Sequence, residues 1–222
     1  MSEASAATFL HPETRVAHVG RDAKLSNGLV NLPPYRGSTV LFDKVEQLKN
    51  SSGHRAYGRW GTPTGRALES ALAQLEGGAN AMLTPSGLSA ITTALLASVK
   101  PGDHILVVDS VHPPVRNFCA TVLKKMNVGV TYYPPLVGAG IAELIQPNTT
   151  VVYTESPGSG TFEVQDIPAI CEAAHRHGAR VLMDNTWATS LGFNPIKHGV
   201  DVSIHSLTKY VVGHSDALLG VI

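Results

Sequence analysis

The chain has 222 residues, 43% of them hydrophobic and 15% charged, and its 17 basic side chains balance 17 acidic ones. This composition is typical of a soluble globular protein with a sizeable apolar core. The balanced charge gives no electrostatic footprint for nucleic acid or for an anionic membrane surface, so we expect neither as a partner.

The cysteines and the two ends of the chain indicate its cellular compartment and how much of the protein it represents. Two cysteines provide no disulfide framework, and the first residues, "MSEASAATFLHPETR", lack the basic region of a secretory signal. We therefore expect a cytoplasmic protein. The last residues, "DALLGVI", stop within a strand-like run. This ending predicts that the chain is the amino-terminal part of a longer protein and lacks a carboxyl-terminal domain.

The chain divides into an irregular and a regular part. Residues 1–60 mix Gly, Pro, Asn and Ser without a hydrophobic period, which predicts an extended arm. Residues 61–222 alternate expected helices with expected strands. The helices are "TPTGRALESALAQLEGG", "SGLSAITTALLASV", "PPVRNFCATVLKKM" and "DIPAICEAAHRHG". The strands are "NAMLT", "HILVVD", "GVTYY", "TVVYTE", "ARVLMDN", "DVSIHS" and "ALLGVI".

Nearly apolar strands that alternate with helices are typical of an α/β domain with a largely parallel sheet covered on both faces. Such sheets bind ligands at the carboxyl ends of their strands. The segments that follow the strands here are "TPSGLSA", "DSVHPP", "ESPGSG", "DNTWAT" and "HSLTKY". Each alone could be a turn or a helix cap, but together they predict one site.

Two of these segments favour an anion. "PSGLSA" places a hydroxyl and free backbone N–H groups at a helix N-terminus, where the helix dipole attracts negative charge. The alternative is that Ser86 only caps its helix. "HSLTKY" adds Ser206 and Thr208 next to Lys209, so that an anion could be held beside an amine. Neither a GxxxxGK[ST] pattern nor a glycine-rich dinucleotide fingerprint is present.

Asp184 is the most informative acid. It closes the apolar run "RVLM", so we expect it to be buried, where an unpaired carboxylate is costly. A pyridinium nitrogen would pair with it, although a salt bridge to Arg180 is the alternative. Pyridoxal phosphate chemistry needs such an acid and a Schiff-base lysine. Asp184, Lys209 and the expected anion site therefore favour pyridoxal 5'-phosphate as the cofactor, and we expect no metal site.

Five motifs strengthen this interpretation: "YGRWGTPT", "PSGLSA", "ESPGS", "DNTWA" and "HSLTKYVVGHSDA". They resemble the cysteine/methionine-metabolism family of fold-type I pyridoxal-phosphate enzymes, from about residue 15 to the end. The resemblance implies an aspartate-aminotransferase-like α/β fold, with a mostly parallel seven-stranded sheet flanked by helices. Residues 61–222 would be the cofactor-binding large domain, and residues 1–60 an arm that contacts a neighbouring subunit.

The resemblance also implies roles for single residues. Lys209 would hold the cofactor aldehyde covalently and then act as the base at the substrate Cα, and Asp184 would keep the pyridine nitrogen protonated. The implied phosphate donors are the backbone N–H groups of Gly87 and Leu88 and the hydroxyls of Ser206 and Thr208, and the implied cofactor-binding set also includes Ser86, Thr186, Tyr57 and Arg59. Tyr57 and Arg59 would reach the cofactor phosphate of a neighbouring subunit.

The implied activity is carbon–sulfur lyase chemistry in methionine biosynthesis and transsulfuration. "ESPGS" with "DNTWA" favours β-elimination of L-cystathionine to homocysteine, pyruvate and ammonia, because γ-cleaving and γ-replacing relatives more often have "ESPTNP" and "DNTF". A γ-lyase, γ-synthase or sulfhydrylase of the same family is one alternative, and a catalytically incomplete cofactor-binding protein is another. The expected assembly is a homotetramer, a dimer of dimers, that takes a small amino-acid substrate.

Two departures from the family pattern stand out. In "DSVHPPVRNFC", His112 takes the place where the family has a tyrosine stacked on the cofactor ring, and a histidine offers a smaller face. We expect His112 to contact the ring and to lower activity. The family's arginine for the substrate α-carboxylate lies beyond residue 222, so this chain has no identified substrate clamp.

Overall fold

The computed structural model describes residues 11–51 and 56–222, which divide into two compact units. The first unit runs to Leu75 and includes Ala79–Ala81, and the second comprises Glu76–Gly78 and Met82–Ile222. The first unit thus contains, besides the residues expected in the arm, most of the helix that follows them. The contact of the arm with a neighbouring subunit stays a prediction.

The first unit has little core of its own. Its elements are α2 (Pro12–His18), α3 (Val45–Lys49), the 3-10 helix η2 (Gly58–Trp60) and α4 (Pro63–Glu76), whose last residue belongs to the second unit. Among the described residues between 11 and 60, Ser26 is the single buried one. An irregular, polar sequence without a hydrophobic period cannot bury enough apolar surface to form a core by itself.

Helix α4 begins where the sequence predicts. Pro63 is its first residue, and the hydroxyl of Thr62 accepts a hydrogen bond from the N–H of Gly65 at 3.3 Å, as an N-cap should. Within the same unit the guanidinium of Arg15 donates to the carbonyl oxygen of Gln74 at 2.6 Å.

Seven strands are present in the second unit as far as it is described, but they form two groups. The main sheet is parallel, with the order β3-β2-β4-β5-β6. Its strands are β2 (His104–Val108), β3 (Gly129–Tyr133), β4 (Thr149–Glu155), β5 (Arg180–Asp184) and β6 (Val202–Ile204). The other two, β1 (Leu83–Thr84) and β7 (Gly220–Val221), pair antiparallel, and an isolated bridge joins Val221 to His205, the residue that follows β6.

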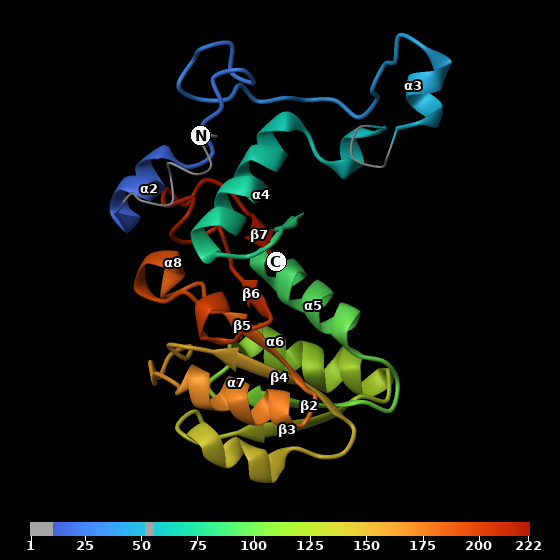
Figure 1. The fold of residues 1–222 in the computed structure, drawn as a ribbon. Helices are drawn as coiled ribbons and strands as arrows, with labels where there is room; N and C mark the ends of the chain where they lie inside the picture. The colour runs from blue at the N-terminus through green and yellow to red at the C-terminus, as the bar shows by residue number, and fades with distance from the viewer. Residues whose placement is uncertain (1–10, 52–55) are drawn as a thin grey trace. The chain divides into compact units, whose positions relative to one another are not determined.

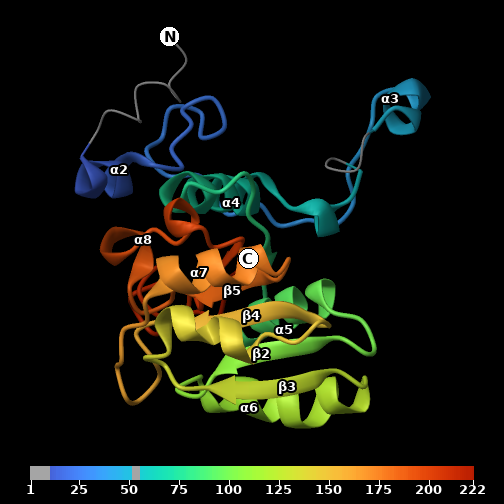
Figure 2. The ribbon, with the colours of Figure 1, turned by 60° about the horizontal axis from the view of Figure 1, so that its bottom comes forward.

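Helices cover both faces of the main sheet. The connection from β2 to β3 runs along the sheet in one direction, and the connections to β4 and β5 run in the other. Because parallel crossovers are right-handed, the helix of the first connection lies on one face of the sheet and the helices of the other two lie on the opposite face. Accordingly α6 packs against α5, and α7 packs against η4 and β5; Figures 1 and 2 show these two layers. The bounds are α5 (Gly87–Ser98), α6 (Pro113–Phe118), η4 (Gly138–Leu144), α7 (Ile167–Arg176), α8 (Thr189–Gly192) and η5 (Ile196–His198).

The local signals in the sequence explain most of these boundaries. The side chain of Asp166 accepts from the N–H of Ala169 at 3.2 Å and caps α7, and Gly178, at φ +78°, follows its end. The helix expected after Pro113 continues beyond α6 as a π-helical turn, η3 (Cys119–Leu123). The 3-10 helix η4 was not predicted, because its sequence "GAGIAEL" is too short and glycine-rich to show a period.

The core lies between the sheet and its helices. All five residues of β2 are buried, and so are all residues of β4 except Thr150, which fits strands covered on both faces. No helix within residues 11–51 and 56–222 is both long and apolar enough to cross a membrane.

Candidate functional site

A cavity of about 740 Å³ lies within the second unit, where β4, β5 and β6 end. Parallel strands place their carboxyl ends on one edge, so segments far apart in sequence meet there. Besides other residues, the cavity is lined by those that the sequence singled out in this unit: Ser86, Gly87, Leu88, His112, Asp184, Thr186, Ser206, Thr208 and Lys209.

Tyr57 and Arg59 are not among the residues that line this cavity. Both are exposed and belong to the first unit, where the guanidinium carbon of Arg59 lies 5.3 Å from the centre of the Tyr57 ring. The two residues therefore form a cation–π pair on the surface of their own unit, and their part in a cofactor site stays a prediction.

Asp184 is the last residue of β5 and is 8% exposed. Its Oδ1 accepts the backbone N–H of Thr186 at 2.9 Å. Arg180, the alternative partner, begins the same strand, and the described part of the chain contains no ion pair that includes Asp184. A buried carboxylate with one hydrogen bond and no cation leaves room for a cationic ligand atom at the cavity.

The N-terminus of α5 meets the lysine loop, which we define as residues 205–213. A Cβ atom added to Gly87 would lie 2.4 Å from the Cβ of Ser206 and 2.8 Å from its Cα, so only glycine allows this approach. Helix geometry leaves the N–H groups of Gly87 and Leu88 without intrahelical acceptors. They and the nearby hydroxyl of Ser206 form a cradle that suits an anion.

The other two hydroxyls expected at the anion are engaged in local structure. The hydroxyl of Ser86 accepts from the N–H of Ser89 at 3.1 Å and so caps α5, as the alternative interpretation holds. The hydroxyl of Thr208 donates to the carbonyl oxygen of Leu219 at 3.2 Å and accepts from its N–H at 3.1 Å. Ser86 can still donate its proton, whereas Thr208 would have to give up its contact with Leu219.

Lys209 lies in a tight turn of the lysine loop. Its N–H donates to the carbonyl oxygen of Ser206 at 3.1 Å, and its own carbonyl oxygen accepts from the N–H of Gly213 at 2.8 Å. Leu207 is fully buried, whereas Lys209 is exposed at the cavity. The turn thus fixes the backbone and leaves the amine accessible to a ligand.

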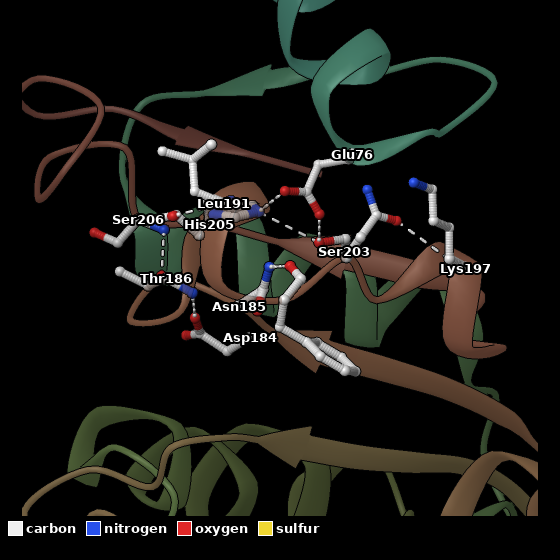
Figure 3. Close-up of polar contacts among 12 residues, drawn as sticks. Glu76, Asp184, Asn185, Thr186, Leu191, Lys197, Ser203, His205 and Ser206 are labelled. Atoms are coloured by element: carbon white, nitrogen blue, oxygen red, sulfur yellow. Dashed lines mark hydrogen bonds and ion pairs between the residues drawn. The ribbon is translucent and has the colours of Figure 1, made fainter. Parts of the chain in front are cut away.

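Side-chain contacts tie this loop to the neighbouring strand end, as Figure 3 shows. The hydroxyl of Thr186 accepts the N–H of Ser206 at 2.7 Å, and the N–H of Thr186 donates to Asp184. The acid and the anion cradle are therefore connected through one threonine. On the other side, the buried residues Glu76, Ser203 and His205 point toward one another.

His112 is the N-cap residue of α6, and its exposed side chain lines the cavity. Its backbone N–H donates to Oε2 of Glu155 at 2.8 Å. The position is open to a planar ligand, as the stacking role requires, but the ring contact itself stays a prediction.

Glu155 is a second buried carboxylate at the cavity, and it is not among the cofactor-binding residues expected from the sequence. It ends β4 directly beside Asp184, with which it is in register. Burial, and next the charge of Asp184, raise its pKa to about 7. Its place at a strand end was visible in "ESPGS", but the burial that sets its charge was not.

Two aromatic side chains border the cavity. Phe162 and Trp187 are 60% and 54% exposed, and their ring centres lie 6.4 Å apart in an edge-to-face arrangement. Trp187 belongs to "DNTWAT", whereas Phe162 had no signal in the sequence. Exposed aromatic rings beside a cavity provide an apolar border for a ligand side chain.

The residues at the cavity match the chemical groups of pyridoxal phosphate. Asp184 is a buried acid without a cation, Gly87 and Ser206 approach so closely that no side chain fits between them, and the amine of Lys209 is free to react with an aldehyde. A cationic nitrogen, a phosphate and an aldehyde on one ring would satisfy all three.

Comparisons with known proteins agree with this match. A family model described as "Cys/Met metabolism PLP-dependent enzyme" matches residues 13–222. A candidate cystathionine beta-lyase of Rhizobium johnstonii is 53% identical over 209 residues, which are 94% of this chain and 53% of that protein. The cystathionine beta-lyase of Escherichia coli is 42% identical over 215 residues, 94% of this chain and 54% of that one.

Solved structures show the same fold. A candidate O-acetylhomoserine (thiol)-lyase of Campylobacter jejuni, with N'-pyridoxyl-lysine-5'-monophosphate in its chain, has a TM-score of 0.86 and 27% identity, and the match covers 96% of this chain and 53% of that one. The chain thus spans about half the length of the relatives it matches.

Proposed function

Because the chain belongs to the pyridoxal-phosphate-dependent enzymes of cysteine and methionine metabolism, we propose that it is the cofactor-binding part of a carbon–sulfur lyase. The proposed reaction is β-elimination of L-cystathionine to homocysteine, pyruvate and ammonia. The observation that carries the proposal is the buried, cation-free Asp184 in one cavity with Lys209. The names of the two relatives above support cystathionine as the substrate.

The proposed roles follow from the contacts of each residue. Bound pyridoxal phosphate supplies an electron sink for the charge that develops at the substrate Cα. Asp184 would hold a proton on the pyridine nitrogen, and Thr186 orients Asp184 through its N–H. Lys209 would attach the cofactor and would be the base for the proton at Cα, so that a thiolate could leave from Cβ.

The remaining residues bind and orient. The N–H groups of Gly87 and Leu88 and the hydroxyl of Ser206 would hold the phosphate, because the N-terminus of α5 directs these two N–H groups to the cavity beside Ser206. His112 would lie against the ring face. Tyr57 and Arg59 would complete the phosphate site of a neighbouring subunit, so the proposed enzyme is a homo-oligomer. The proposed assembly is a dimer of dimers, and its proposed location is the cytoplasm.

A γ-elimination or thiol-transfer reaction is the second candidate, favoured by the likeness to the (thiol)-lyase structure. β-elimination and γ-elimination need the same lysine and acid, so variants of these residues cannot distinguish the two reactions. The identity of the product can. We would incubate the purified protein with pyridoxal phosphate and L-cystathionine and measure pyruvate and 2-oxobutyrate. Pyruvate as the product supports β-elimination. 2-Oxobutyrate as the product would show that the reaction is γ-elimination.

Two variants make the result specific. Lys209→Ala should abolish product formation, and Lys125→Ala, an exposed lysine outside the cavity, should leave it unchanged. Cofactor binding without either product would favour a catalytically incomplete cofactor-binding protein. The absence of cofactor binding would overturn the proposal.

A further inference from the structure

Glu155 joins two segments that border the cavity. Its Oε2 accepts the backbone N–H of His112 at 2.8 Å, and its Oε1 accepts the hydroxyl of Ser159 at 2.5 Å. The first segment follows β2 and the second follows β4. One carboxylate thus uses both oxygens to hold two loops that belong to different strands.

The bond to His112 has no substitute within the described residues. His112 is the N-cap of α6, and among the described hydrogen bonds its N–H has Glu155 as its one acceptor. The loops have one further link, from the N–H of Ser159 to the carbonyl oxygen of Ser110 at 2.9 Å. Glu155 therefore holds the amide side of the His112 backbone, whose carbonyl oxygen accepts the N–H of Val115 at 2.9 Å within α6.

We propose that Glu155 is a positioning residue that holds His112 at the cofactor site through its hydrogen bond to the His112 amide. This proposal rests on the proposed function in one respect, which is that pyridoxal phosphate is the ligand beside His112. Glu155 lines the cavity but is buried, and its oxygens are engaged with protein groups, so it acts through His112.

The surroundings of Glu155 act on its pKa in both directions. Burial, the largest cause, and the negative charge of Asp184 on β5 raise the pKa. The hydroxyl of Ser159 and the N–H of His112 lower it, because they stabilise the ionised form. Among other titratable groups, His112 and Lys209 line the same cavity as Glu155, and the phenol of Tyr153, on the same strand, interacts with its charge. The resulting pKa of about 7 means that its charge changes near neutral pH.

The isosteric variant Glu155→Gln separates geometry from charge. The amide oxygen of glutamine can accept the N–H of His112, and its NH2 group can donate to Ser159, so both contacts persist without a charge. Glu155→Ala removes both contacts. Ser159→Ala removes one of them and keeps the charge, and Glu172→Gln, on the surface of α7, repeats the chemical change away from the cavity.

The first measurement uses the cofactor-free protein. The 15N–1H resonance of the His112 amide is followed by NMR from about pH 5 to about pH 9. We expect a shift with a midpoint near pH 7 in the wild type and in Glu172→Gln that is clearly larger than the shift in Glu155→Gln, in which the charge beside the amide no longer changes. A shift of equal size in Glu155→Gln, or none in the wild type, would overturn the proposal.

The second measurement is the dissociation constant of pyridoxal phosphate at about pH 6, where Glu155 is mostly protonated and glutamine mimics it best. Glu155→Gln should match the wild type within roughly twofold, and Glu155→Ala should bind about tenfold more weakly, because a buried hydrogen-bond partner is lost. Ser159→Ala should lie between them. Wild-type affinity in a folded Glu155→Ala would contradict the proposal, whereas a wild type that binds no pyridoxal phosphate contradicts the proposed function and leaves the NMR result to decide this one.

Discussion

Glu76 and His205 are in buried polar contact at the start of the lysine loop: Oε1 of Glu76 lies 3.0 Å from Nε2 of His205, and their side chains are 10% and 7% exposed. The hydroxyl of Ser203 donates to Oε2 of Glu76 at 2.7 Å and lies 3.3 Å from the same imidazole nitrogen. His205 directly precedes Ser206 of the anion cradle, and its backbone bridges to Val221. The pair therefore stabilises the strand end from which the lysine loop begins.

We expect Glu76→Ala to destabilise the protein by about 3 kcal/mol, because it leaves a buried imidazole and a buried hydroxyl without their acceptor. Glu76→Gln should cost less, since the amide can still accept from one group and donate to the other. Denaturant unfolding monitored by circular dichroism measures both. Glu143→Ala, an exposed glutamate, serves as the control and should change the unfolding free energy by less than about 0.5 kcal/mol; an equally small effect at Glu76 would contradict the account.

The raised pKa of Glu155 predicts a pH dependence of stability. Its pKa rises from 4.5 to about 7 on folding, so between these values the folded protein holds a proton that the unfolded chain has released. The unfolding free energy must then fall as pH rises through this window, by about 3 kcal/mol in total.

Glu155→Gln removes this contribution, so the variant should be more stable than the wild type at about pH 8 and equal to it at about pH 4.5. Unfolding in denaturant at the two pH values tests the prediction as a difference between the proteins, in which other titrating groups cancel. A variant that is less stable than the wild type at the higher pH would show that the carboxylate is not disfavoured by folding.

Gly87→Ala should close the anion cradle. The new Cβ would lie 2.4 Å from the Cβ of Ser206, so the lysine loop and α5 would have to move apart, at a cost of about 1–3 kcal/mol in stability. We expect affinity for pyridoxal phosphate to fall by at least about tenfold, because the donors no longer converge. Gly37→Ala is the matched control, since no atom lies within 4 Å of its added Cβ.

His112→Tyr restores the aromatic residue typical of the family. A phenol ring offers a larger face for stacking, worth about 0.5–1.5 kcal/mol, or roughly a twofold to tenfold gain in kcat/KM with cystathionine. Steady-state kinetics of the two proteins decide the matter. An unchanged kcat/KM would show that His112 does not limit activity.

Local signals were enough to predict most elements and the place of the site. Pro63 and Asp166 mark helix starts because capping depends on neighbouring residues alone. The apolar strands alternate with helices, and that alternation implies a parallel sheet whose carboxyl ends converge. Lys209, Asp184 and Ser206 were therefore expected in one place, although the acid and the lysine are 25 positions apart, and the structure brings them to one cavity.

Features that depend on distant neighbours could not be predicted. The division of the seven strands into two groups depends on the pairing of Leu83 with Val221, which no local pattern encodes. Ser203 and Glu76 are 127 positions apart, and the charge of Glu155 depends on its burial beside Asp184. Such contacts follow from packing, whereas a sequence pattern describes one element at a time.

The central claim is that Lys209 binds pyridoxal phosphate covalently. The most direct measurement is to incubate the purified protein with the cofactor, record an absorption band near about 420 nm, reduce the adduct with borohydride and locate the added pyridoxyl group by peptide mass spectrometry. We predict the label on Lys209, and no band or label in Lys209→Ala. A colourless wild-type protein, or a label on a different lysine, would contradict the account.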